Sequence, residues 1–196
     1  LLASLYGVDD ASASDPCELP RSPSLACVRE DGGSWTRLLR DPRPALLALL
    51  DSRRFEGRAL LLGVTEDSAQ VATPSGIVSL PLAELGKLWT GEAWRLWQRP
   101  PAIGRTLGRG DAGADVAAVA ALFARLDDQA SPLAAETFNG PLEERVRLFQ
   151  RDQGLIADGV LGEQTLRALV LAAGDDLDFA AARTRFSEQV AAGEVG

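Results

Sequence analysis

The sequence predicts an α+β fold in which a strand-rich first half precedes a helical second half. Before residue 100, short apolar runs alternate with turn residues, a pattern typical of strands. After it, apolar residues recur at intervals of three and four, as on one face of a helix. Arg99-Pro100-Pro101 lies between the two patterns and indicates a linker. We therefore expect a small α+β domain over residues 1–100, a three-helix domain over 101–172 and a helical tail over 173–196.

The first domain contains five apolar segments of strand length and one short helix. The expected strands are 45–50, 59–64, 70–73, 77–80 and 94–97. Ala59-Leu60-Leu61-Leu62 is nearly continuous, which favours a strand that is buried on both faces. Pro74-Ser75-Gly76 marks a turn between two strands. Ser34 is placed to cap a short helix that begins at Trp35.

The second domain is predicted to contain three amphipathic helices. Asp111 or Asp115 is placed to cap the first. Pro141 suits the start of the second, and Gly154 its end, because glycine readily adopts the left-handed conformation. The Asp158-Gly159 turn precedes the third. The three apolar stripes are Val116, Val119, Ala120, Phe123 and Leu126; Leu142, Val146 and Phe149; and Thr165, Leu166, Leu169 and Val170.

Two features of the sequence leave open whether the chain binds a protein partner. Trp89, Trp94 and Trp97 precede the linker, and they either pack on the sheet or form an interface, where aromatic residues are enriched. The tail has apolar residues at helical spacing from Phe179 onwards, and Asp178 is placed to cap that helix. We expect the tail either to dock on its own chain or to contact a partner or a second copy.

Composition excludes several classes of protein. Apolar residues make up 46% of the chain and charged residues 24%, as in ordinary globular proteins. The net charge of −8 argues against nucleic acid, which binds clustered Lys and Arg. No window holds 18 consecutive apolar residues, so no membrane-spanning segment is expected. The chain has no Met, even at position 1, which suggests a piece of a longer protein.

Cys17 and Cys27 are the two cysteines, ten positions apart in a segment rich in Pro and Ser. Two cysteines cannot complete a structural zinc site alone, and the sequence has no His. We expect a disulfide, which implies an oxidising compartment. The alternative is a pair of reduced, partly buried thiols.

An internal repeat runs through the second domain. Phe138-Asn139-x-x-Leu142-x-x-x-Val146 lines up with Leu161-Gly162-x-x-Thr165-x-x-x-Leu169. With the Val146-x-x-Phe149-Gln150 helix and the Asp158-Gly159-x-x-Gly162-x-x-Thr165 turn, it resembles the peptidoglycan-binding domain of bacterial cell-wall proteins. The first half departs from that pattern, because Ala135-Glu136 replaces an Asp-Gly turn and Leu142 replaces a Thr.

The resemblance implies a shallow groove that holds a glycan or a peptide stem beside these turns. The matching positions are Phe138, Arg147, Gln150, Asp158, Gly159, Gly162 and Thr165. Each has a structural alternative: Asp158 and Thr165 could satisfy backbone N–H groups, and Phe138 could belong to the core. Arg147 and Gln150 are expected on the solvated side of their helix.

The first domain resembles papain-like peptidases of the C39 type. The resemblance rests on segments 43–47, 57–64, 71–76 and 85–91. It places Arg58 at the position of the catalytic His and Thr73 at that of the catalytic Asp. Cys17 would be the remnant of the nucleophile, without a base to take its proton.

A degenerate peptidase domain followed by a peptidoglycan-binding domain resembles the periplasmic part of the type II secretion A component, the general secretion pathway protein A family. Leu5-Tyr6-Gly7-Val8 is similar to the Leu-Trp-Gly-Val of that family. The resemblance implies a non-catalytic module that anchors an inner-membrane protein to the wall. With a B-type partner it would support assembly of the outer-membrane secretin. Self-association stays open.

The alternatives are a wall hydrolase or a protein-interaction module that has lost wall binding. The absence of His removes zinc hydrolases and peptidases with a His base. A carboxylate-dependent hydrolase stays as the enzymatic alternative, because acidic residues are plentiful. Such residues in the first domain include Glu18, Glu30, Asp51, Glu56, Glu66 and Asp67. No cofactor is expected, and the phosphate-binding motif Gly-x-x-x-x-Gly-Lys-Ser/Thr does not occur.

Overall fold

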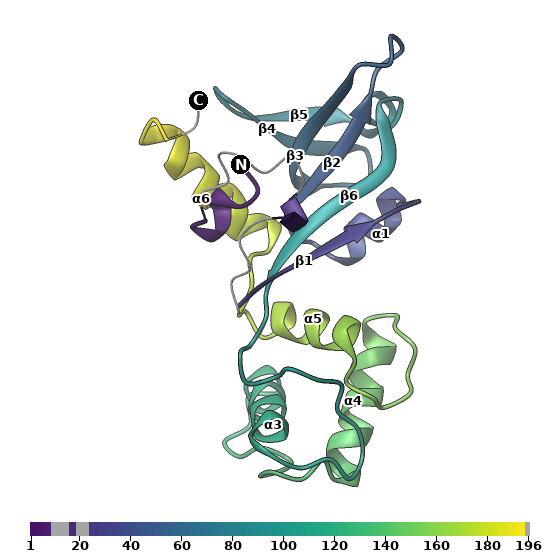
Figure 1. Ribbon diagram of the computed structural model, residues 1–196, viewed down its shortest axis with the longest axis vertical. Coiled ribbons are helices and arrows are strands. Elements are labelled where there is room, and N and C mark those ends of the chain that lie inside the picture. The colour runs from purple at the N-terminus through teal and green to yellow at the C-terminus, as the bar shows by residue number, and fades with distance from the viewer. Residues whose placement is uncertain (9–15, 19–23, 195–196) are drawn as a thin grey trace. The chain divides into compact units, whose positions relative to one another are not determined.

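The computed structural model describes residues 1–8, 16–18 and 24–194. It divides into two compact units, which we call the sheet unit (Leu1–Trp97 with Leu177–Gly196) and the helical unit (Gln98–Asp176). Figure 1 shows the strands in the former, whereas the latter is helical. The α+β class predicted from the sequence is confirmed.

The sheet unit is built on six strands in the order β1-β6-β2-β3-β4-β5. Their bounds are β1 Leu25–Glu30, β2 Ala45–Leu50, β3 Glu56–Val64, β4 Ser68–Thr73, β5 Gly76–Pro81 and β6 Trp89–Gln98. All five predicted strands are present, and β2 has the predicted bounds. β1 was not predicted, because Cys27 was expected in a loop. β1 is an edge strand, at the end of the strand order next to β6. Its own sequence pattern is weak, and it forms a strand because it pairs with β6.

The helices of the sheet unit are short except for the last one. They are the 3-10 helices η1 (Ser4–Tyr6) and η2 (Pro16–Glu18), and the α-helices α1 (Trp35–Arg40), α2 (Leu82–Gly86) and α6 (Phe179–Ala191). As predicted, Ser34 caps α1, its hydroxyl accepting from the N–H of Arg37. Asp178 caps α6 by accepting from the N–H of Ala181 at 2.7 Å.

Strand β3 is buried on both faces, as its apolar run predicted. Leu60 and Leu62 belong to one core cluster, together with Trp94 and Phe186. Leu61 lies between them and belongs to a second cluster. Because successive side chains of a strand point to opposite faces, β3 separates the two cores.

Helix α6 packs on the sheet unit, so the tail docks on its own chain, one of the two alternatives left open above. Figure 1 shows α6 beside the N-terminal helix η1. The side chains of Phe186 and Ala182 are buried. Nη1 of Arg185 donates to the carbonyl of Leu5 at 2.6 Å, and Nε2 of Gln189 donates to that of Ser4 at 3.0 Å. The sequence predicted a separate tail over 173–196. In the structure, the chain from Leu177 onwards belongs to the sheet unit.

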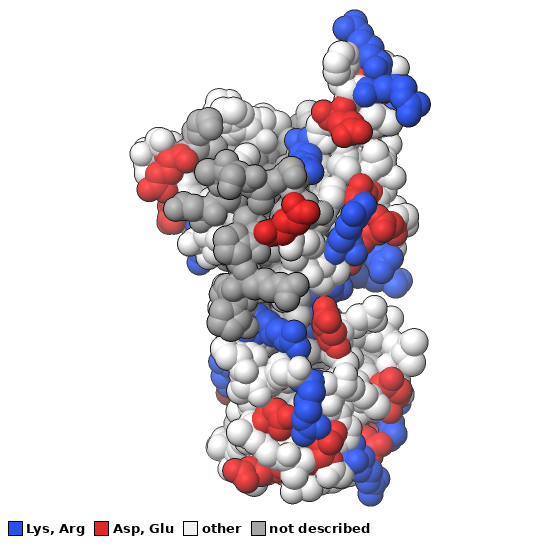
Figure 2. Space-filling view, viewed as in Figure 1, with Lys and Arg blue, Asp and Glu red and all other residues white. Residues whose placement is uncertain are grey.

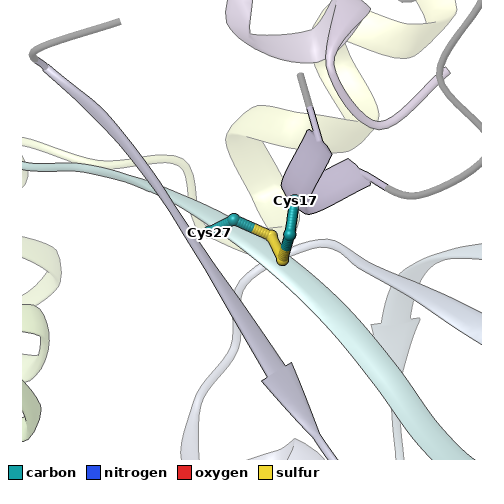
Figure 3. The surroundings of a disulfide bond; sticks show 2 residues. All are labelled: Cys17 and Cys27. Carbon is teal, nitrogen blue, oxygen red and sulfur yellow. A yellow bond between two sulfur atoms is a disulfide. The ribbon is translucent and has the colours of Figure 1, made fainter. Parts of the chain in front are cut away.

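The predicted disulfide is present. Cys17 of η2 is bonded to Cys27 of β1, with their Cα atoms 5.2 Å apart (Figure 3). The bridge ties the N-terminal segment to the sheet across a separation of ten residues.

Removing this bridge should destabilise the sheet unit. In the chain-entropy model, a loop of this length stabilises the folded state by about 2.5 to 3 kcal/mol. We expect the Cys17→Ser/Cys27→Ser variant to lose a free energy of unfolding of that order in denaturant titration. The helical unit, which holds neither cysteine, should unfold as in the parent. Equal stability of the two proteins would contradict the prediction.

The helical unit contains α3 (Ala114–Leu126), α4 (Gly140–Asp152) and α5 (Glu163–Ala172). Phe123 of α3 and Phe149 of α4 meet edge to face in the core, with ring centroids 5.7 Å apart. Gly154 has φ +66° after α4, as expected for a helix end. The predicted cap of α3 was wrong: Gly113 occupies the cap position without a side-chain bond. No helix in the described residues is long and apolar enough to cross a membrane.

Candidate functional site

The internal repeat corresponds to two similar helix starts in the helical unit. Asn139 and Gly162 are the capping residues of α4 and α5. The residues before them, Phe138 and Leu161, are both 1% exposed. Each half also forms one β-bridge to the segment that begins at Leu107. Leu161 pairs with Leu107, and Thr137 pairs with Ala112. The two halves thus pack alike, although their turns differ in sequence.

Gln150 organises the turn of the second half, and it does so from inside the protein. Its side chain is 1% exposed, whereas the sequence placed it on the solvated side of α4, and that prediction was wrong. Oε1 accepts from the N–H of Gly159 at 2.9 Å. Nε2 is within 2.9 Å of both Oδ1 of Asp158 and the carbonyl of Val160. Nε2 also donates to Oγ1 of Thr165 at 3.1 Å. One amide therefore holds both sides of the turn and the first turn of α5.

Glycine is required at position 159 for two reasons. Its φ of +77° lies in the left-handed region, which other residues rarely adopt. A Cβ atom built there would also lie 3.0 Å from Nε of Arg147 and from Cγ of Glu143. Arg147 is fixed against the turn by an ion pair with Glu143 at 2.5 Å. α4 thus packs directly against the backbone of the turn.

Asp158 is the exposed charged member of this network. Its Oδ1 accepts from the N–H of Val160 at 2.9 Å and from Gln150. The N–H of Val160 and then the amide of Gln150 hold the pKa of the Asp158 carboxyl below its ordinary value. The site therefore presents an ionised carboxylate to solvent at neutral pH.

A surface pocket of about 270 Å³ lies beside this turn. Its lining residues are Gln150, Leu155, Ile156, Asp158, Val160, Gly162, Glu163, Gln164 and Thr165. Ile156 is 84% exposed, although it is a large apolar residue. The predictions did not include Ile156 or Leu155. An apolar pair directly after the helix-ending Gly154 was the signal available in the sequence.

The predicted site residues divide into three groups. Gln150, Asp158, Gly162 and Thr165 line the pocket, and Gly159 and Arg147 support the turn from behind. Phe138 lies apart from them: its ring is buried, and its backbone bonds to Asp111 at 2.8 Å. The described residues include no cluster of three or more His, Cys, Asp or Glu side chains that could hold a metal ion.

Acid should destabilise the helical unit through carboxylates with lowered pKa values. The main cause at Asp127 is the bidentate bond from Arg145, at 2.5 and 2.7 Å. A lowered folded-state pKa contributes stability above the unfolded value of about 3.9 and loses it as pH falls through the folded value. We expect the unfolding temperature to fall below about pH 4. Thermal unfolding from pH 6 to 2 measures this, and Arg145→Gln should flatten the dependence. An unchanged slope in that variant would contradict the assignment to Asp127.

One comparison with known proteins concerns the helical unit, which contains the pocket. Residues 112–169 match the sequence model of a family described as "Putative peptidoglycan binding domain". The match includes the Gln150 network and all the lining residues of the pocket. The matched residues all lie within the helical unit, which is therefore similar to this domain family. The predicted resemblance is thereby confirmed for this unit.

Two longer matches include the sheet unit as well. The chain is 24% identical over 176 residues to General secretion pathway protein A of Aeromonas hydrophila, covering 90% of this chain. It spans about a third (32%) of that relative. It also resembles the crystal structure of a periplasmic domain of the EpsAB fusion protein of the Vibrio vulnificus type II secretion system. The TM-score is 0.64 at 28% identity, covering 86% of this chain and 73% of that one. The predicted likeness to the general secretion pathway protein A family is confirmed over most of the chain.

Proposed function

We propose that this chain is a periplasmic module that binds peptidoglycan for a type II secretion assembly factor. The observation that carries the proposal is the pocket beside the Asp158 turn. It lies on the face of a peptidoglycan-binding domain and combines exposed apolar side chains with an ionised carboxylate. Wall polymers offer the matching groups: apolar faces of sugar rings, methyl groups, hydroxyl groups and amide N–H donors.

Each part of the pocket has a role in this proposal. Ile156 and Val160 lose water when they contact an apolar face of the ligand, which supplies most of the binding energy. Asp158 accepts a hydrogen bond from a ligand hydroxyl or amide and sets its orientation. Gln150 and Gly159 are buried, so they support the residues that bind the ligand and do not bind it themselves. They hold the turn so that Asp158 and Ile156 are already in position.

The chain acts without catalysis in this proposal. Cys17 is in a disulfide and so has no free thiol, and there is no His to serve as a base. A carboxylate-dependent hydrolase needs a general acid whose pKa is raised. The pocket carboxylate of Asp158 has a lowered pKa instead.

The relatives suggest the context of wall binding. We propose that the chain is the soluble part of an inner-membrane-anchored protein and that it fixes that protein to the wall. A B-type secretion protein is its partner in this proposal, because the solved relative is named as a fusion called EpsAB. Together they would support assembly of the outer-membrane secretin. Self-association of the chain is compatible with this role.

Co-sedimentation with purified sacculi tests the proposal. The parent chain should pellet with the sacculi, and the turbidity of the wall suspension should stay constant over hours. A parent that stays in the supernatant would overturn wall binding. A fall in turbidity would instead support the hydrolase alternative.

A further inference from the structure

The sheet unit has a hollow of about 590 Å³ on one face of its sheet. Residues of β1, β2, β3 and β6 line it. Further along this face, Leu5 of η1 and Phe186 of α6 pack over Leu60 of β3. Arg58 is two residues before Leu60, so it belongs to the same face but lies in the hollow. The residues that line the hollow all belong to strands, and none of them belongs to a helix.

Trp94 lines the hollow, and two guanidinium groups lie over its ring. Cζ of Arg58 lies 5.1 Å from the centroid of the Trp94 ring, and Cζ of Arg29 lies 5.6 Å from it. Arg29 is neutralised by an ion pair with Glu92 at 2.5 Å. Arg58 is exposed and has no acid partner in the part of the chain that the structure describes. Contact with the ring holds its head group while its N–H donors stay available.

A second charged residue at the hollow, Glu56, also has no ion-pair partner among the described residues. Glu56 precedes Arg58 by two residues on β3, so both side chains leave the strand on the same face, about 7 Å apart at their Cα atoms. Both line the hollow, and Glu56 is exposed. Within the described ranges, Glu56 has no cationic partner and does not pair with Arg58. Figure 2 shows acidic and basic side chains next to one another at several places on the face drawn.

We propose that this hollow binds a zwitterionic peptide, with its carboxylate at Arg58 and its ammonium group at Glu56. Opposite charges that face one hollow without pairing are complementary to a ligand that carries both. The proposed source is the stem peptide of peptidoglycan, which carries free amino and carboxylate groups. That choice of source rests on the wall binding proposed above. Once the helical unit holds the polymer, stem peptides are present at high effective concentration, so a weak site suffices.

Three dipeptides test the charge assignment on the whole chain. They are D-Ala-D-Ala, its N-acetyl form without the ammonium group, and its C-terminal amide without the carboxylate. Affinities are measured from shifts of the Trp94 indole N–H signal in ¹⁵N NMR titrations. The zwitterion should bind about tenfold more tightly than either singly charged form. Three equal affinities, or no shift of Trp94, would overturn the proposal.

Two variants separate the two contacts. Arg58→Gln should abolish the preference for the free acid over the amide and keep the preference for the free amine. Glu56→Gln should do the reverse. Arg40→Gln is the matched control, since Arg40 is exposed on α1 and has no acid partner among the described residues. It should keep both preferences. If Arg58→Gln and Glu56→Gln behave like this control, the assignment fails.

The source is tested with soluble muropeptides released from sacculi. They should shift the same Trp94 signal, and failure to do so while D-Ala-D-Ala binds would overturn the wall as source. Sacculus pelleting keeps this proposal distinct from the function above. If the parent pellets but the dipeptides do not bind, the hollow proposal fails alone. If the parent does not pellet, wall binding fails, and the dipeptide preferences still decide whether the hollow binds zwitterions.

Discussion

Ile156→Ser should weaken binding of the chain to peptidoglycan sacculi by about 10- to 150-fold, the equivalent of losing the burial of one large aliphatic side chain. Ile156 is 84% exposed, so it contributes little to the folded state of the free protein. Its apolar surface becomes buried only when a ligand fills the pocket. Binding curves from co-sedimentation at increasing sacculus concentration would measure the effect.

Leu148→Ser is the matched control for this experiment. Leu148 is also a large exposed apolar residue of the helical unit, at 44% exposure, but it does not line the pocket. We expect it to pellet like the parent. Both variants should unfold thermally within a degree or two of the parent. Equal pelleting of Ile156→Ser and Leu148→Ser would place the wall contact elsewhere.

Gln150→Leu should destabilise the helical unit and abolish binding at the same time. The substitution keeps the volume of the side chain but leaves the buried N–H of Gly159 and the hydroxyl of Thr165 without Gln150. Leaving a buried polar group without a partner costs about 1 to 3 kcal/mol. For a unit of this size, that lowers the unfolding temperature by at least about 4 °C. Thermal unfolding and sacculus binding of the same preparation measure the two effects.

Gln153→Leu provides the control for Gln150→Leu. It makes the same chemical change three residues later, at an exposed position at the end of α4. We expect little effect on either unfolding or binding. The role assigned to Gln150 would be wrong if both variants unfolded at the temperature of the parent.

Local signals in the sequence were sufficient for most of the fold. β2 has the bounds that its apolar run predicted, and Ser34 and Asp178 cap the helices they were expected to cap. These features depend on residues that are close together in the sequence. They can therefore be predicted without knowledge of the rest of the chain. β1 was missed because an edge strand is defined by its neighbour, and the Pro and Ser residues around Cys27 indicated a loop.

The sequence predicted the motif of the candidate site, but it did not predict the hydrogen bonds of Gln150 that hold the site together. The Asp158-Gly159 turn and Thr165 were identified, and all three contact Gln150 or the pocket. Gln150 was expected in solvent because polar residues on a helix usually face water. Its burial depends on a turn eight to ten residues further along, which folds back over the helix and satisfies the amide.

The sequence by itself determined the class of the fold, the cystine and the likeness of its second half to a wall-binding domain. Those properties follow from periodicity, from cysteine count and from short motifs. The tertiary structure decided which residues of the motif are accessible, how the tail docks and which charged side chains, Arg58 and Glu56 among them, line the hollow of the sheet unit. Accessibility and charge pairing arise from contacts between distant segments, and such contacts exist only once the chain has folded.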